Sequence, residues 1–192
     1  TKYRIIIIVS VLMFTSLVQR SDAAEPGFSL QLLESRKIWD KALFNGFTDL
    51  ERFEGQWYIC FREGTAHGGV WDGNIRIIRS KEGQSWESAA SIQCPEGDVV
   101  DLRDGKLSIT PDGMLMLTSS AYWPPEKCTT YVWFSANGSD WGKEVKIGPP
   151  GEWMWRTVWH NGTAYNFARD ETCMGGDWDR SYLQLYKSDN GK

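Results

Sequence analysis

Three stretches of the chain repeat one pattern: Ser80-Lys81-Glu82-Gly83-Gln84-Ser85-Trp86, Ser135-Ala136-Asn137-Gly138-Ser139-Asp140-Trp141 and Ser188-Asp189-Asn190-Gly191-Lys192. Glycine follows serine by three residues in each copy, and in the first two copies tryptophan follows glycine by three more. The serines lie 55 and 53 residues apart. A repeat of this length made of short strands and tight turns is typical of β-propellers, in which each repeat forms one blade. Serine, acidic and glycine residues suit the turn itself, and the tryptophan suits packing between strands.

Short apolar runs separated by glycine turns favour an all-β fold. Leu107–Thr110 and Met114–Leu117 flank Pro111-Asp112-Gly113, which predicts a hairpin. Glu54-Gly55 and Asn161-Gly162 provide the equivalent turn in the neighbouring repeats. The strands expected to enter the serine turns are 75–79, 131–134 and 182–186.

Each repeat therefore reads as a blade of four antiparallel strands. Glycine turns join the first strand to the second, and serine turns join the third to the fourth. The loops between second and third strands then lie at the opposite end of the blade. We expect a six-bladed β-propeller, of which residues 46–192 supply nearly three blades, the third incomplete.

The segment before the propeller is expected to have two parts. Residues 1–23 resemble a secretory signal peptide, with Lys2 and Arg4 before a largely apolar run of 14 residues, 5–18, and Ser21-Asp22-Ala23 as a cleavage site. This predicts a secreted or periplasmic protein with no membrane segment in its mature form. Residues 24–45 are expected to form a cap segment, with a short helix or extended chain over 28–43.

Composition narrows the class of partner. The net charge is −4 and no basic cluster is visible, so nucleic acid is not an expected partner. Four cysteines allow two disulfides in three possible pairings, although Cys60 lies in an apolar strand and suits a buried thiol equally well. Their spacing does not suit a zinc site, and we expect no metal and no cofactor.

The first and third blades also match in their candidate site residues. At an offset of 107 residues, Arg62 aligns with Arg169 and Asp49 with Arg156. Both aligned pairs stand near the loops that share one end of the blades. Residues gathered there would form a binding surface, with Trp123 and the tryptophans beside Arg156 as platforms for sugar rings.

The serine turns resemble the Asp boxes of the sialidase superfamily. Phe61-Arg62-Glu63 resembles the first blade of that superfamily, and Leu102-Arg103-Asp104 its second. The stretch from Lys37-Ile38-Trp39-Asp40 onward is similar to secreted bacterial exo-α-sialidase-like proteins, over about residues 36–192. The resemblance implies a sialidase-type propeller.

The resemblance also implies a chemistry: three arginines hold the carboxylate of an acidic sugar, an aspartate acts as acid/base and a tyrosine–glutamate pair is the nucleophile. Arg62 matches a clamp arginine, Asp72 the acid/base with His67 as its rival, and Asp104 an acidic residue of the pocket. The nucleophile and the other clamp arginines are expected in blades beyond Lys192. The substrate-binding candidates are Arg62, Glu63, Asp49, Asp104, Arg156, Arg169 and Trp123.

Two departures from the sialidase pattern leave other functions open. Phe47-Thr48-Asp49-Leu50 stands where sialidases have Arg-Ile-Pro, and Gly105 follows Asp104 where proline is usual. The leading prediction is a glycoside hydrolase that releases a terminal acidic sugar. The alternatives are a propeller glycosidase for another sugar, a carbohydrate-binding propeller without catalysis, and an interaction scaffold.

Overall fold

The computed structural model describes residues 31–94, 100–123, 127–170 and 182–189. Two compact units are present, Thr1–Arg36 and Lys37–Lys192, and every described strand belongs to the second. The expected signal peptide lies outside the described residues. Residues 31–43 contain no helix, so the described part of the cap segment is not helical. No helix in the described residues has the length and apolar character needed to span a membrane.

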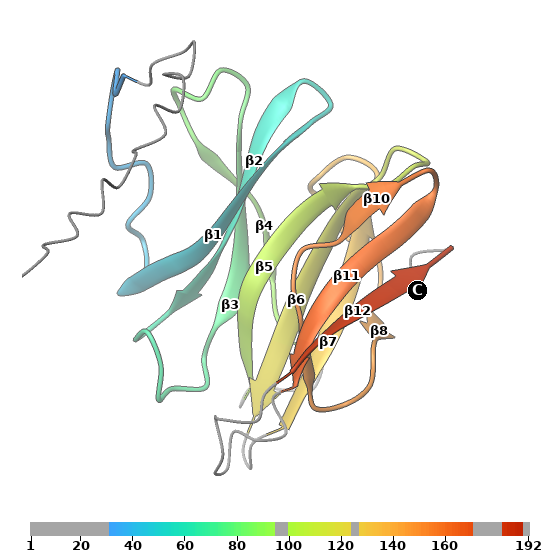
Figure 1. Cartoon of the computed structure of the whole chain (residues 1–192). Helices are drawn as coiled ribbons and strands as arrows, with labels where there is room; N and C mark the ends of the chain where they lie inside the picture. The colour runs from blue at the N-terminus through green and yellow to red at the C-terminus, as the bar shows by residue number, and fades with distance from the viewer. Residues whose placement is uncertain (1–30, 95–99, 124–126, 171–181, 190–192) are drawn as a thin grey trace, which may run out of the picture. The chain divides into compact units, whose positions relative to one another are not determined.

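Three four-stranded antiparallel sheets make up the second unit, which is the all-β propeller architecture predicted from the repeats (Figure 1). Blade 1 has the order β1-β2-β3-β4, with strands Phe44–Phe53, Gln56–Gly64, Asn74–Ser80 and Glu87–Ile92. Blade 2 has the order β5-β6-β7-β8, with strands Asp101–Ile109, Leu115–Trp123, Lys127–Ser135 and Val145–Ile147. Blade 3 contains β9, β10, β11 and β12, with strands Glu152–Met154, Val158–His160, Thr163–Asp170 and Leu183–Ser188. In blade 3, β9 and β10 pair with the same strand, β11, and are two halves of one interrupted first strand.

The glycine turns occur where the sequence predicted them. Gly55, Gly113 and Gly162 all have positive φ, between 73° and 83°. In the first and third of these turns the preceding residue, Glu54 or Asn161, is also left-handed, with φ of 48° and 49°. Two consecutive left-handed residues match the twist of the flanking strands in a two-residue hairpin.

The serine turns are held by the serine hydroxyl. The amide of Gly83 donates to Ser80 Oγ at 2.9 Å, and that of Gly138 donates to Ser135 Oγ at 2.8 Å. Both serines are buried at the ends of β3 and β7. The repeated pattern therefore serves the fold, because it closes the hairpin between the third and fourth strands.

Each first strand is interrupted at a similar level. The register of β1 shifts between Gly46 and Asp49, and that of β5 shifts between Arg103 and Lys106. In blade 3 the gap between β9 and β10 is bridged by one side chain, since Asn166 accepts from the Trp155 amide and donates to the Trp155 carbonyl. Bulges of this kind bend a strand and redirect its side chains.

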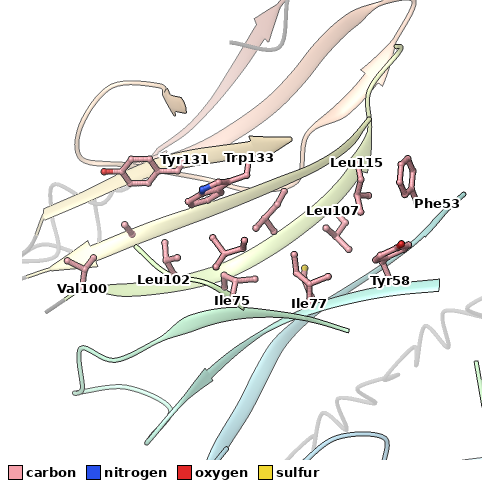
Figure 2. Close-up of a cluster of buried hydrophobic side chains, with 14 residues drawn as sticks. Phe53, Tyr58, Ile75, Ile77, Val100, Leu102, Leu107, Leu115, Tyr131 and Trp133 are labelled. Carbon is pink, nitrogen blue, oxygen red and sulfur yellow. The ribbon is translucent and has the colours of Figure 1, made fainter. Parts of the chain in front are cut away.

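The main core lies between blades 1 and 2 (Figure 2). Ile75 and Ile77 of β3 face Leu102 and Leu107 of β5, with the Tyr58 ring at one end. All five side chains are fully buried. Contacts among β1, β2, β3 and β5 place the first strand of blade 2 against the face of blade 1.

The two faces of blade 3 differ in exposure. Ala164, Asn166 and Ala168 of β11 are buried. On the other face Phe167 is 44% exposed, and its cross-strand partner Leu185 is 72% exposed. This face of blade 3 is therefore apolar and exposed.

Cys60 has the buried-thiol environment that was one of the two alternatives. It is fully buried in β2 as a free cysteine. Burial, together with the nearby Asp49 carboxylate, raises the pKa of the Cys60 thiol far above its ordinary value. The thiol therefore stays neutral and unreactive. Cys173 lies outside the described residues.

Candidate functional site

A buried carboxylate links two arginines where β5 begins. Asp101 is fully buried, and its Oδ1 accepts a hydrogen bond of 2.6 Å from Arg62 Nε. Its Oδ2 accepts from Arg103 Nε at 2.5 Å. The Arg62 side chain is itself fully buried, whereas that of Arg103 is 22% exposed. Of the two arginines, Arg103 is the one that reaches solvent.

Arg62 makes its remaining contacts with the loop between β2 and β3. Its Nη1 donates to the Ala66 carbonyl at 2.8 Å, and its Nη2 lies 3.5 Å from Asp72 Oδ1. The Phe44 ring lies 5.4 Å from the guanidinium. The structure thus gives Arg62 protein partners and no exposed surface, and its role as a substrate ligand stays a prediction.

Asp72 closes the same loop. Both of its carboxylate oxygens accept from the Thr65 amide, at 3.3 and 3.1 Å. The side chain is 37% exposed, so one side of it faces solvent. These contacts give Asp72 a role in loop geometry, and its expected role as acid/base stays a prediction.

Asp104 occupies the bulge of β5. Its φ is 52°, a left-handed conformation that costs about 1 kcal/mol or more for a residue with a Cβ. Its Oδ2 accepts a hydrogen bond of 3.1 Å from Trp153 Nε1 of blade 3. Burial raises the pKa of the Asp104 carboxyl, and this is only partly opposed by Lys106, Trp153, Arg103 and Arg169. A carboxyl with a raised pKa is a candidate proton donor.

Three aromatic side chains near Asp104 form a row of ring contacts, which begins at Trp153. The ring centroids of Trp153 and Tyr122 lie 6.5 Å apart, and those of Tyr122 and Trp71 lie 5.0 Å apart. The Arg103 guanidinium lies 5.8 Å from the Tyr122 ring. Trp71 and Tyr122 are half-buried, as expected of aromatic rings that offer one face to a ligand.

A second aromatic group surrounds His67. Its ring lies 5.4 Å from Phe44 and 5.2 Å from Phe47, and the residue is exposed. Phe47 lies in the bulge of β1 with a φ of 58°, which is rare for a bulky residue. His67 is thus held by aromatic edges, and its expected role as rival acid stays a prediction.

Asp49 and Arg156 come together and link three blades. Arg156 Nη1 donates to both Asp49 oxygens, at 2.9 and 3.1 Å, and its Nη2 donates to Glu51 at 2.7 Å. Asp49 Oδ2 also accepts from the Leu107 amide of β5 at 2.8 Å. The repeat alignment predicted that these two residues occupy corresponding places, but it did not predict that they pair with each other. Their expected roles as substrate ligands stay predictions.

Of the remaining candidates, Glu63 lies apart from Asp104, Arg169 lies near it, and the side chain of Trp123 is not described. Glu63 accepts from Trp39 Nε1 at 2.7 Å and from Arg76 Nε at 2.8 Å, on the face of β2 opposite Arg62. Arg169 pairs with Trp153 in the ladder of β9 and β11, and its charge acts on Asp104. Trp123 ends β6, and its side chain is outside the described part.

Two residues that shape the site were not predicted from sequence. Asp101 precedes the Leu-Arg-Asp stretch that suggested the second blade, and nothing in a single acidic residue indicates burial between two arginines. Phe47 was noted only as part of a departure from the sialidase pattern. Gly46, directly before Phe47, was the available signal, because an isolated glycine inside a strand pattern indicates a bulge.

The described residues hold no group of three or more histidine, cysteine, aspartate or glutamate side chains placed to bind a metal. The chemistry available in this part of the molecule is that of a carboxyl with a raised pKa, an accessible arginine and a row of aromatic rings. These groups suit a polar, ring-shaped ligand such as a sugar.

No protein-family model and no curated protein matches the chain. Solved structures do match it. An α-L-arabinanase from Penicillium chrysogenum is 15% identical over 77% of this chain and 47% of its own, with a TM-score of 0.61. A family 117 glycoside hydrolase from Zobellia galactanivorans is 12% identical over 76% of this chain and 52% of its own, with a TM-score of 0.53.

A microbial sialidase also matches, at 12% identity over 76% of this chain and 31% of its own, with a TM-score of 0.53. The expected sialidase-type likeness is thus shared with arabinanases and another glycosidase. The chain spans about half the length of the first two of these structures. At these identities the comparison shows the fold alone, a β-propeller that this chain shares with these glycoside hydrolases.

Proposed function

We propose that the chain is part of a glycoside hydrolase whose site lies where the first strands of the blades begin. The Asp104 carboxyl carries this proposal. It lies in a bulge, bonds to Trp153 and has a pKa raised by burial. A glycosidase needs such a group to protonate the departing oxygen.

The surrounding residues support a glycan as the ligand. Trp71 and Tyr122 continue the ring contacts that begin at Trp153, and both rings are half-buried. As the finer proposal we retain a sialoside or another acidic sugar. Its support is the resemblance of the serine turns and of Phe61-Arg62-Glu63 to sialidases.

The test compares Asp104→Asn with Asp72→Asn in the full-length protein. Initial rates are measured on a panel of aryl glycosides that includes α-L-arabinofuranosides and α-sialosides. If Asp104 is the acid, its variant loses about 10²–10⁴-fold in kcat. The Asp72 variant should lose far less, because Asp72 acts on the loop.

Leaving-group dependence sharpens the test. A dinitrophenyl leaving group departs without protonation, so Asp104→Asn should keep much more activity on it than on an alkyl glycoside. An equal loss on both would contradict the acid role. If Asp72→Asn shows the leaving-group effect instead, Asp72 is the acid.

The aromatic row favours a second candidate, a propeller that binds carbohydrate without cleaving it. Calorimetry with the same glycans separates the two, since binding without released sugar would support this candidate and oppose the hydrolase.

A further inference from the structure

We infer that Asp101 is a positioning residue that fixes Arg103 at the candidate site, and that Arg103 selects glycans with an anionic substituent, such as a carboxylate or sulfate. This inference rests on the proposed glycan site and names the group that determines its specificity. It concerns two residues outside the set of sequence candidates.

The geometry at Asp101 leaves one end of Arg103 available. Asp101 uses one oxygen for Arg62 Nε and the other for Arg103 Nε. The bond to Nε holds the guanidinium by its inner nitrogen. With Nε engaged, the outer nitrogens Nη1 and Nη2 are the pair that can make a two-pronged contact with a carboxylate or sulfate.

Neighbouring groups also fix the direction of Arg103. The guanidinium lies over the Tyr122 ring at 5.8 Å. Its Nη2 reaches the loop between β2 and β3, since a Cβ added to Gly68 would lie 3.9 Å from it. Arg103 therefore lies between the aromatic row and the loop that carries His67.

Burial explains why Asp101 is rigid. Asp101 and Arg62 are both fully buried, so each needs the other as its counter-charge. The adjacent Leu102 amide donates to the Gly73 carbonyl at 2.9 Å. A Cβ on Gly73 would lie 1.8 Å from Asp101 Oδ1, so the backbone closely packs that carboxylate. Arg103 is thus tied to a fixed anchor.

Charge balance favours an anionic ligand. Arg62 and Asp101 neutralise each other in the interior, and Arg103 shares the same carboxylate. The neighbouring Asp104 has a raised pKa and a weakened tendency to carry negative charge. Asp72 also lies 3.5 Å from Arg62, but Lys106 and Arg169 act on Asp104 together with Arg103. Positive side chains therefore outnumber the carboxylates around Arg103, although the chain as a whole is acidic.

The experiment measures glycan binding by the full-length protein on an array in which each carboxylated or sulfated glycan has a neutral analogue. The variants are Arg103→Gln, Arg103→Lys and Asp101→Asn, with Arg52→Gln as the control. Arg52 is an exposed arginine at the other end of blade 1, where it donates to the Gly55 carbonyl. The control removes the same charge without touching the site.

We expect the wild-type protein and Arg52→Gln to prefer acidic glycans over their analogues by about tenfold or more, the usual scale of one charge-assisted contact. Arg103→Gln should abolish the preference, and Arg103→Lys should restore part of it. Asp101→Asn should reduce the preference while leaving affinity for neutral analogues within about threefold, a split that general unfolding would not produce.

Three results would overturn the inference: no acidic glycan bound, no preference in the wild type, or a preference that survives Arg103→Gln. If Asp101→Asn does not fold, judged by circular dichroism, the two Arg103 variants decide alone, because they leave the Arg62–Asp101 pair intact. Cleavage with no charge preference would leave the proposed hydrolase standing, whereas charge preference without cleavage would leave this inference standing.

Discussion

Among single residues, Asp104 should make the free energy of unfolding depend on pH. Its raised folded-state pKa means that the folded protein holds this proton more tightly than the unfolded chain. The Asp104 carboxyl therefore stabilises the folded state below the ordinary carboxyl pKa of about 4. This stabilisation is lost as the pH rises through the pKa that Asp104 has in the folded protein.

We expect Asp104→Asn to be at least as stable as the wild type at pH 7, because the amide stays neutral and can accept from Trp153. The advantage should shrink as the pH falls toward about 4. Urea unfolding of both proteins between pH 4 and pH 8 measures this. A variant whose stability deficit grows with rising pH would contradict the assignment.

Glu54 offers a second test at the same scale. It is exposed and left-handed, with φ of 48°, directly before Gly55. Asparagine tolerates this conformation better than glutamate, as it does at Asn161 in blade 3. Glu54→Asn should raise stability by roughly 0.5 kcal/mol, and Asn161→Glu should lower it by a similar amount, by thermal melting. A loss of stability in Glu54→Asn, or a gain in Asn161→Glu, would show that the turn conformation is not the cause.

At the scale of elements, the two serine turns make different contacts with blade 1. Gly83 and Gly138 have nearly equal φ, 72° and 73°. A Cβ on Gly83 would meet nothing closer than Trp57 at 3.9 Å, whereas one on Gly138 would lie 2.4 Å from the Tyr58 ring. Tyr58 also donates to the Asn137 carbonyl at 3.2 Å, so the second turn packs onto blade 1.

Alanine substitutions should separate backbone strain from steric overlap. Gly83→Ala should cost about 1 kcal/mol, the strain alone. Gly138→Ala should cost about 1–3 kcal/mol more, because Tyr58 is fully buried and has little room to move. Chemical denaturation of both variants checks the order, and equal losses would mean that the Tyr58 contact is loose.

The elements were readable from sequence because they depend on local chemistry. A glycine turn between two apolar runs predicts a hairpin. A serine three residues before a glycine predicts the turn between the third and fourth strands. The bulges left only a partial sign in the sequence: Gly46 and Gly105 stand at the breaks in blades 1 and 2, but no glycine stands at the gap in blade 3. The repeated break in all three first strands appears only once the ladders are paired.

For the whole molecule, the Asp49–Arg156 pair should couple blade 1 to blade 3. Its partners are 107 residues apart in sequence, and Asp49 also bonds to β5 of blade 2. A double-mutant cycle with Asp49→Asn and Arg156→Gln should give a coupling energy of about 1 kcal/mol that weakens in 1 M salt. Arg156 is 40% exposed, which limits the size of the effect. Additive losses would show that the pair does not connect the blades energetically.

Blade order and the end of the molecule that carries the candidate site were predictable, because strand alternation sorts the loops into two groups. The hydrogen-bond and ion-pair partners of the site residues could not be predicted. Sequence placed Arg62, Asp72 and Asp104 near one end, but it did not show that Arg62 is fully buried on Asp101 or that Glu63 bonds to Trp39. Such pairings depend on which face each side chain takes and on the packing of blade against blade.

The apolar face of blade 3 has a practical consequence for handling the protein. Cys60, the counterpart of Phe167 in the repeat, is buried against the next blade, whereas Phe167 and Leu185 meet solvent. A sample of residues 37–192 should therefore self-associate as its concentration rises, through contacts that salt does not weaken. Sedimentation velocity at several concentrations would detect this, and Leu185→Lys should keep the sample monodisperse if the face is responsible.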